Sequence, residues 1–307
     1  MGNTFTYKNP IYTDAFESIR DPQITVVDGV YYLTGSLPPY WEGLSPGMKL
    51  FRSPDLKNWE FAADLIRRDD VPDAAWYKDR FWAPEIHHTG GRFYLTFGAK
   101  NEAKGADFGM AVLVADEIAG PYRMLTEEGP LAVGRGIDLS LMTDDDGKIF
   151  GFWASGEWIQ VAELGLEQAT PLTEPARCVT MAPGTWEDRV IEGPYCIKRG
   201  GVYYLFYSCG ARGYEVGYAT APSPFGPWTK AENNPLFGVQ NQEACDKMGI
   251  PFTGDPDHPL FFAGHNSIFP GPDGRDWTSY LIQEKGKPEQ MGIDPIWIED
   301  GVVKTTA

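Results

Sequence analysis

A two-residue turn recurs five times along this chain of 307 residues, and it constrains the fold more than any other feature. Each copy is an Asp-Gly or Gly-Gly pair that is soon followed by aromatic or β-branched residues, which is typical of a tight hairpin between two strands. The second residue of each pair is a glycine, and these glycines are Gly29, Gly91, Gly147, Gly201 and Gly274. Successive copies are 62, 56, 54 and 73 residues apart, so five units account for the whole chain.

A second landmark keeps the same phase. Trp59, Tyr122 and Trp228 end turn-like segments that follow the glycine of their own unit by 27 to 31 residues. Each unit therefore holds about four strands, and no segment shows the periodicity of a long helix. Repeats of this kind predict an all-β, five-bladed β-propeller with four-stranded antiparallel blades around a central axis, in a single domain over residues 1–307. Two stacked β-sandwiches are the rival fold, but they would not repeat in phase.

Charge and hydropathy exclude several classes of partner. The formal net charge is -17, which argues against a nucleic-acid partner because such binding needs clustered positive charge. No segment approaches the roughly 18 consecutive apolar residues of a membrane helix, so we expect no membrane partner. The first residues lack an apolar stretch of signal-peptide length. We therefore expect a cytoplasmic protein, or a secreted or periplasmic one whose leader has been removed.

The four cysteines follow no metal-binding spacing. Cys196 and Cys209 could lie on neighbouring strands, and the sequence leaves open whether they pair. It also leaves the oligomeric state open.

Polar residues precede the hairpin turns at similar distances. Asp138, Glu192 and His265 lie 9 residues before the glycine of their unit, whereas Asp21 lies 8 and Glu85 lies 6 residues before. If the strand before each turn lines the axis, these side chains converge from five blades. Converging carboxylates raise one another's pKa, so that one acid stays protonated opposite an ionised one. That pair is the equipment for hydrolysing a glycosidic bond.

The motifs around these residues resemble those of family 43 glycoside hydrolases, which are five-bladed β-propellers acting mainly on arabinose- and xylose-containing polymers. The motifs occur in order as Arg20-Asp21-Pro22, Trp82-Ala83-Pro84-Glu85, Ile137-Asp138-Leu139-Ser140, Glu192-Gly193-Pro194 and Gly264-His265-Asn266-Ser267. The resemblance implies that Asp21 is the general base and Glu192 the general acid, while Asp138 orients the acid and modulates its pKa. Leu139 stands where the family often has proline.

The resemblance also implies a place for His265 at the axis, near the substrate or near a calcium ion bound through water. No cofactor is required for the expected reaction. The run from Asp144 to Gly147 is acidic, but it lacks the alternating ligands of a calcium loop, and we interpret it as a hairpin turn.

Further candidates for substrate binding are Trp82, Glu85 and Arg212, with Tyr40, Trp41 and Trp158 as other possible stacking residues. Specificity should depend on loops around residues 37–46, 99–109 and 240–259.

The sequence thus predicts an inverting, exo-acting glycosidase that hydrolyses terminal α-L-arabinofuranosyl or β-D-xylosyl residues and whose partner is a carbohydrate. Two alternatives stay open. One is a fructan-type propeller glycosidase, which retains configuration; the Trp-x-Asn-Asp-Pro-Asn motif expected for it is missing. The other is a propeller that binds carbohydrate without catalysis, although it would have no need of a cluster of carboxylates.

Overall fold

Five antiparallel sheets follow one another along the chain, and each corresponds to one sequence repeat. The computed structural model describes residues 5–105 and 108–307. Blade 1 contains β1 (Arg20–Val27), β2 (Val30–Ser36), β3 (Gly47–Ser53) and β4 (Glu60–Arg67). Blade 2 contains β5 (Arg80–Thr89), β6 (Arg92–Lys100), β7 (Gly109–Ala115) and β8 (Arg123–Met124).

The later blades add short strands to the same plan. Blade 3 contains β9 (Ile137–Thr143), β10 (Ile149–Ala154), β11 (Trp158–Gly165) and β12 (Thr170–Pro171), with β13 (Ala176–Thr180) also paired to β11. Blade 4 contains β14 (Ile191–Arg199), β15 (Val202–Cys209), β16 (Gly213–Ala221) and β17 (Thr229–Lys230), with β18 (Phe237–Gln240) also paired to β16. Blade 5 contains β19 (Leu260–Pro270), β20 (Asp276–Glu284), β21 (Gln290–Glu299) and β22 (Val302–Thr305).

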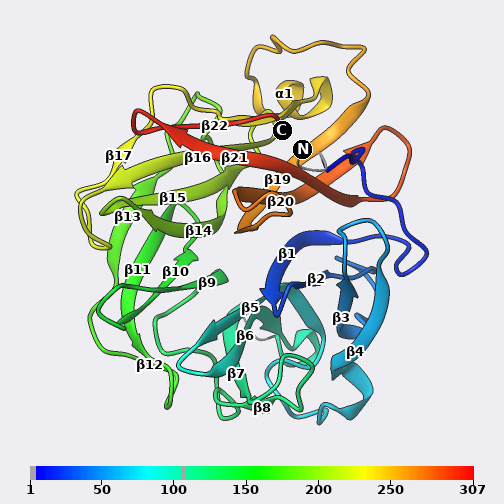
Figure 1. Cartoon of the computed structure of the whole chain (residues 1–307), viewed down its shortest axis with the longest axis vertical. Coiled ribbons are helices and arrows are strands. Elements are labelled where there is room, and N and C mark those ends of the chain that lie inside the picture. Colours follow the sequence, from blue (N-terminus) through cyan, green and yellow to red (C-terminus); the bar gives the residue numbers. More distant parts are fainter. Residues whose placement is uncertain (1–4, 106–107) are drawn as a thin grey trace.

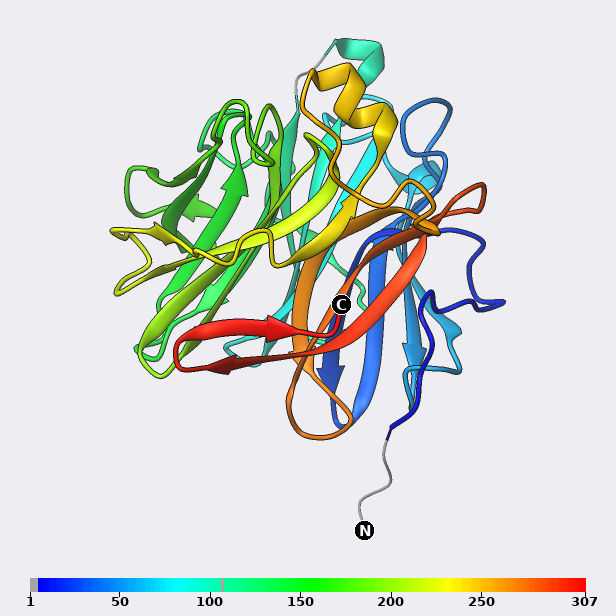
Figure 2. The same ribbon diagram turned by 90° about the horizontal axis from the view of Figure 1, so that it is seen from above.

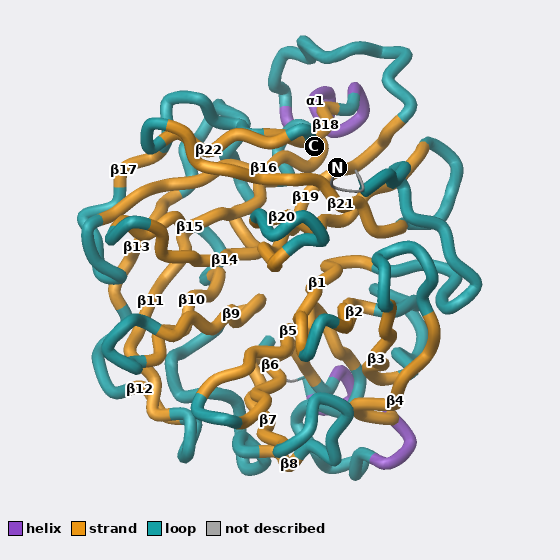
Figure 3. The backbone as a smooth tube through the Cα atoms, in the orientation of Figure 1, coloured by secondary structure: helices purple, strands orange, loops and turns teal. Residues whose placement is uncertain are grey.

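The first strand of every blade lies at the centre of the molecule. Strands β1, β5, β9, β14 and β19 surround the axis, and each lies against the first strands of the two neighbouring blades (Figure 1). Strands and loops make up nearly all of the backbone (Figure 3). The predicted five-bladed β-propeller is therefore confirmed, including its innermost strands. All five hairpin turns join the first strand of a blade to the second.

The described helices are short: η1 (Arg68–Asp70), η2 (Glu102–Lys104) and α1 (Gln242–Met248). Helix α1 lies within the segment that the sequence predicts as a long loop. It begins because the Asn241 side chain accepts the Ala244 N–H, and it ends at Gly249, whose φ of 67° lies in the left-handed region. Figure 2 shows α1 and η2 on the same side of the ring. None of the helices in the described residues is long and apolar enough to cross a membrane.

The core consists of five apolar clusters, each between two neighbouring blades. Leu50 of blade 1 and Phe97 of blade 2 belong to one cluster, and Phe152 of blade 3 and Tyr207 of blade 4 to another. All four residues are at most 2% exposed. Truncating a buried aromatic residue to alanine typically costs about 3–5 kcal/mol. The clusters therefore hold the blades, and with them the axial side chains, in fixed relative positions.

The ring closes through the segment that precedes β1. Ile11 N–H donates to Met291 O over 2.8 Å, and Ile19 N–H donates to Glu289 O over 3.1 Å. The side chain of Asn9 exchanges two hydrogen bonds of 3.0 Å with the backbone of Ile293. The beginning of the chain is thereby joined to its last blade.

The four cysteines are unpaired. Across the β14–β15 ladder, Cys196 faces Leu205 and Cys209 faces Ile191, so these two thiols occupy different ends of the pair of strands. The pairing that the sequence leaves open does not occur.

Candidate active site

Every first strand is interrupted near its beginning by a β-bulge. The ladder to the second strand shifts register there in all five blades. The same backbone position has a positive φ each time, at 52°, 44°, 59°, 57° and 52° for Asp21, Ala83, Asp138, Gly193 and His265. Bulges re-aim side chains and are common next to active sites, where strained backbone is also concentrated. The five bulges therefore mark equivalent positions around the axis.

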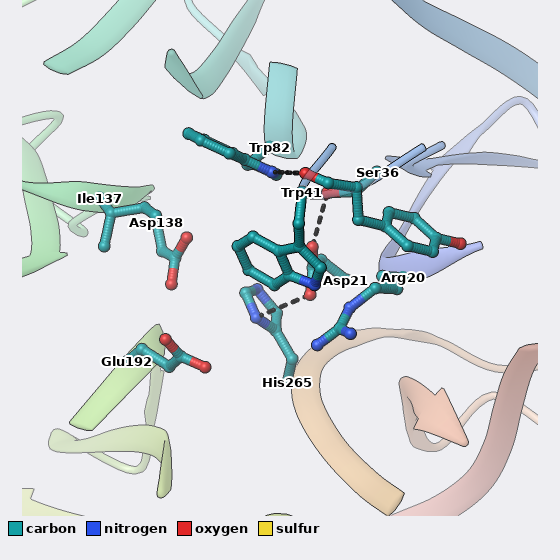
Figure 4. A pocket seen from close by; sticks show the side chains of 10 residues that line it. Arg20, Asp21, Ser36, Trp41, Trp82, Ile137, Asp138, Glu192 and His265 are labelled. Carbon is teal, nitrogen blue, oxygen red and sulfur yellow. Dashed lines mark hydrogen bonds and ion pairs between the residues drawn. The ribbon is translucent and has the colours of Figure 1, made fainter. Parts of the chain in front are cut away.

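At the bulges, β1 and β9 each turn two consecutive residues toward one pocket at the axis, and each of the other three first strands contributes one residue (Figure 4). Asp21, Asp138 and His265 stand at the bulge position itself, whereas Glu192 precedes the bulge and corresponds to Arg20, Trp82 and Ile137. The described residues that line this pocket are Arg20, Asp21, Ser36, Tyr40, Trp41, Trp82, Ile137, Asp138, Glu192 and His265. The position of the bulge therefore identifies equivalent residues in the five blades more accurately than the number of residues to the hairpin glycine does.

Gly193 leaves little room for a side chain. The His265 ring packs against it, and a Cβ atom at Gly193 would lie only 3.1 Å from Nδ1 of the ring. Blade 4 therefore carries its functional carboxyl group one residue earlier, at Glu192.

Two side chains hold Asp21. Ser36 Oγ donates to Oδ2 over 2.5 Å, and Nδ1 of His265 lies 3.2 Å from Oδ1. Because Ser36 Oγ accepts the Ala83 N–H over 2.7 Å, its own hydrogen is directed at Asp21. Both oxygens of Asp21 are thus acceptors, as a general base requires. Burial lowers the pKa of His265, but the carboxylates of Asp21, Asp138 and Glu192 outweigh it and raise the pKa overall.

Asp138 and Glu192 lie side by side opposite Arg20 in the pocket (Figure 4). Tyr214 Oη donates to Glu192 Oε1 over 2.8 Å, and the Gly193 N–H donates to Asp138 Oδ2 over 3.0 Å. The pKa of Asp138 is raised to about 7, chiefly by burial and also by the charges of Glu192 and Asp21, whereas His265 and the Gly193 N–H oppose the rise. Burial and the Glu192 charge also raise the pKa of Tyr214 well above its usual range, so its phenol stays a donor.

The structure places several predicted residues outside this pocket. Glu85 is buried two residues beyond the bulge of blade 2 and is absent from the lining. The guanidinium of Arg212 forms hydrogen bonds of 2.8 and 2.9 Å with Glu215 instead. The ring centre of Trp158, on β11, lies 3.8 Å from the guanidinium carbon of Arg177, on β13. The geometry therefore gives no support to substrate contacts by these three side chains.

Sequence reasoning missed three residues that shape the site, namely Arg20, Ser36 and Tyr214. Arg20 is the one arginine or lysine among the described residues of the lining. Its place directly before the bulge could have identified it from the sequence as a pocket residue. Ser36 and Tyr214 come from β2 and β16, and no motif marks them.

The axis offers a metal few direct ligands. Among residues 5–105 and 108–307, no group of three or more His, Cys, Asp or Glu side chains is arranged to hold an ion. Glu85 Oε2, however, is buried without a hydrogen-bond partner. It lies 3.0 Å from His87 Nε2, and the Leu141 N–H points at the same nitrogen over 3.3 Å. The donor set fits an ion bound through water and does not fit a directly coordinated one.

Carboxyl groups that face one another in a pocket are the arrangement that most glycoside hydrolases use. Residues 7–303 match the model for glycosyl hydrolases family 43, and the chain belongs to this family.

Curated relatives agree with this assignment. The chain is 30% identical to xylosidase/arabinosidase 43B of Humicola insolens, over 87% of this chain and 47% of the relative. It is 27% identical to β-D-galactofuranosidase xynD of Aspergillus niger, over 90% of this chain and 76% of the relative. The chain thus spans about half the length of the Humicola enzyme.

Solved structures share the fold. A thermostable family-43 glycoside hydrolase superposes with a TM-score of 0.77 at 25% identity, covering 98% of this chain and 96% of the other. An endo-1,4-β-xylanase of Bacteroides thetaiotaomicron superposes with a TM-score of 0.76 at 29% identity, covering 95% of both chains.

Proposed function

We propose that this chain is an inverting, exo-acting glycosidase that removes terminal α-L-arabinofuranosyl or β-D-xylosyl residues. The observation that carries the proposal is the meeting of three carboxyl groups from blades 1, 3 and 4 in one pocket, each with its own hydrogen-bond donor. The names of relatives such as the Humicola xylosidase/arabinosidase support the choice of sugars. The loop of residues 37–46 contributes Tyr40 and Trp41 to one wall of the pocket, which supports exo action.

Asp21 has the surroundings of a general base. Ser36 and His265 fix its carboxylate, so its orientation does not have to be found during the reaction. In the proposed step, Asp21 takes a proton from a water molecule while the water oxygen forms a bond to the anomeric carbon. The positive charge favoured on His265 offsets part of the negative charge that surrounds Asp21.

Glu192 has the surroundings of a general acid. Tyr214 occupies Oε1, so Oε2 is the oxygen that can carry a proton to the leaving group. In the same step, the bond from the anomeric carbon to the leaving oxygen breaks and that oxygen takes the proton of Glu192. Asp138 binds the N–H of the next residue, Gly193, and thereby positions the backbone that carries the acid.

Product stereochemistry tests this mechanism. Wild-type protein is mixed with aryl α-L-arabinofuranoside, β-D-xyloside and β-D-galactofuranoside in turn, and proton NMR follows the first sugar released before it mutarotates. We expect cleavage of at least one of the two pentosides with inversion. Retention would require a carboxyl pair only about 5–5.5 Å apart and a covalent intermediate, and it would overturn the role of Asp21. Binding of sugars without any turnover would favour the non-catalytic alternative.

We further propose that a structural calcium ion binds through water at the axis beside His265. Support comes from Glu85, whose buried Oε2 lacks a donor and whose charge acts on His265. A hydrated cation would satisfy this oxygen without a direct ligand set.

A further inference from the structure

A charged side chain outside the pocket reaches toward it from blade 5. Glu289 lies in the turn between β20 and β21, directly before β21, and its side chain is 18% exposed. Its Oε1 lies 3.7 Å from Nη1 of Arg20, which lines the pocket. Burial lowers the pKa of Arg20, but neighbouring groups that include Asp21 and Glu289 raise it overall. The acid of blade 5 therefore acts on the cation of blade 1 where the ring closes.

The other carboxylate oxygen of Glu289 binds the segment that leads into β1. Ser18, which is 5% exposed, donates from Oγ to Glu289 Oε2 over 3.2 Å, and its Oγ lies 2.6 Å from Oη of Tyr40. Because Ser18 has one hydroxyl hydrogen and a carboxylate only accepts, Tyr40 is the donor in the second bond. The carbonyl group of Glu289 also accepts the Ile19 N–H over 3.1 Å. Glu289 thus contacts Ser18, Ile19 and Arg20 in succession.

The guanidinium of Arg20 is held in place and yet keeps donors for a ligand. The 3.7 Å from Nη1 to Glu289 is longer than a hydrogen bond, so this pairing is electrostatic. The guanidinium carbon also lies 5.5 Å from the ring centre of Tyr40, within the range of a cation–π contact. Figure 4 shows the guanidinium turned into the pocket, across from Glu192. Its N–H groups can therefore donate to oxygen atoms of a sugar.

We propose that Glu289 is a positioning residue for the reaction, because it orients Arg20 to bind hydroxyl groups of the sugar that is released. The inference rests on the proposed function, since Arg20 acts only when a sugar occupies the pocket. A guanidinium presents its donors in a rigid fork, so its direction decides which hydroxyl groups it reaches. Fixing a long side chain in advance also lowers the entropic cost of binding. Glu289 supplies both effects without touching the substrate.

The first experiment removes the charge of Glu289 and keeps its shape. Glu289→Gln can still accept the Ser18 hydroxyl, and the Ile19 N–H can still bind its main chain. On an aryl pentoside we expect kcat/KM to fall about threefold to fivefold, mainly through KM, which is the upper range for a partly exposed ion pair. Because the ring-closing bonds remain, Tm should change by less than about 2 °C.

The second experiment tests whether Glu289 acts through Arg20. Arg20→Ala should lower kcat/KM about 10- to 100-fold, since it removes charge-assisted hydrogen bonds to the substrate. Adding Glu289→Gln to Arg20→Ala should then cost less than about 1.5-fold, because the side chain through which Glu289 acts is gone. A further loss as large as that of the single Glu289→Gln variant would mean that Glu289 acts by another route, and it would overturn the inference.

Monodeoxy analogues of the same aryl pentoside give a readout that a merely structural role would not move. On the analogue that lacks the hydroxyl group bound by Arg20, Glu289→Gln and wild type should have equal kcat/KM, because neither can make that contact. On the other analogues the difference between the two proteins should persist. The same loss in Glu289→Gln on every analogue would contradict the orienting role.

Glu284→Gln provides a matched control, because it removes the same charge at the other end of the same turn. Glu284 binds Lys287 over 2.5 Å and the hydroxyl group of Tyr12, and it is not among the described residues that line the axial pocket. This variant should leave kcat/KM unchanged. Wild-type activity in Glu289→Gln would overturn the inference alone, whereas wild-type protein that cleaves no pentoside would overturn the proposed function and the inference with it.

Discussion

Asp138→Asn should change the pH dependence of stability in a direction that the structure defines. The substitution removes the charge, while the amide oxygen can still accept the Gly193 N–H. Burial together with the Glu192 and Asp21 carboxylates raises the pKa of Asp138 to about 7 in the folded protein, against an ordinary value of 3.8. The fold therefore favours the protonated form of this side chain.

The sign and size follow from linkage. The stabilising effect of protonated Asp138 is complete below about pH 4 and is lost as the pH rises through about 7. Three pKa units correspond to at most about 4 kcal/mol. The loss of stability is smaller than this limit if the coupled carboxyl groups share a proton. It is also smaller because a charged His265 stabilises ionised Asp138. An asparagine side chain cannot ionise, so the variant should avoid this loss.

The assay is urea unfolding of both proteins at several pH values from 4 to 8. Subtracting the wild-type free energy of unfolding from that of Asp138→Asn cancels the other titrating groups, and we expect this difference to increase with pH in favour of the variant. Asp14→Asn, at an exposed acid before β1, should give a flat difference. A difference for Asp138→Asn that is equally flat would refute the reasoning.

Three other predictions concern catalysis and metal binding. Asp21→Asn and Glu192→Gln should each lower hydrolysis of an oligosaccharide by about 10²–10⁴-fold with the fold intact, and an activated leaving group should rescue only Glu192→Gln; near wild-type turnover in either variant would contradict the assigned roles. In Asp138→Asn the alkaline limb of the kcat/KM profile should move to lower pH, because repulsion between Asp138 and its coupled neighbours no longer delays the loss of the last proton from the carboxyl cluster; an unmoved limb would show that Asp138 acts only by position. Removal of calcium by a chelator should lower Tm, with recovery on adding calcium; an unchanged Tm would oppose the axial ion.

Much of the fold could be predicted because the repeat is local. A two-residue turn determines the pairing of the strands on either side of it, so five turns identify the first two strands of five blades. The outer strands lack such a marker. Strands β8, β12 and β17 have only two residues each, and β13 and β18 add to blades that already have four strands.

The site could be predicted only as far as the motifs on the first strands reach. Asp21, Asp138, Glu192, His265 and Trp82 do come together in one pocket. Ser36 reaches Asp21 because β2 pairs Ser36 with Arg20, and Tyr214 of β16 reaches Glu192 across β15 while its ring lies against Gly264 of blade 5. Register of this kind is a property of the assembled sheet, and single-sequence patterns do not contain it.

The residue types at the bulges connect the backbone to the chemistry. Aspartate, asparagine and histidine tolerate a positive φ better than other residues with a side chain, and Asp21, Asp138 and His265 are the polar residues that hold this conformation on the axis. The strained backbone costs about 1–3 kcal/mol at each such position, and the apolar clusters between blades can sustain it. In return, the main chain aims each of these side chains at the pocket. Asparagine suits the same backbone, so Asp21→Asn and Asp138→Asn should keep the bulges and report on charge alone.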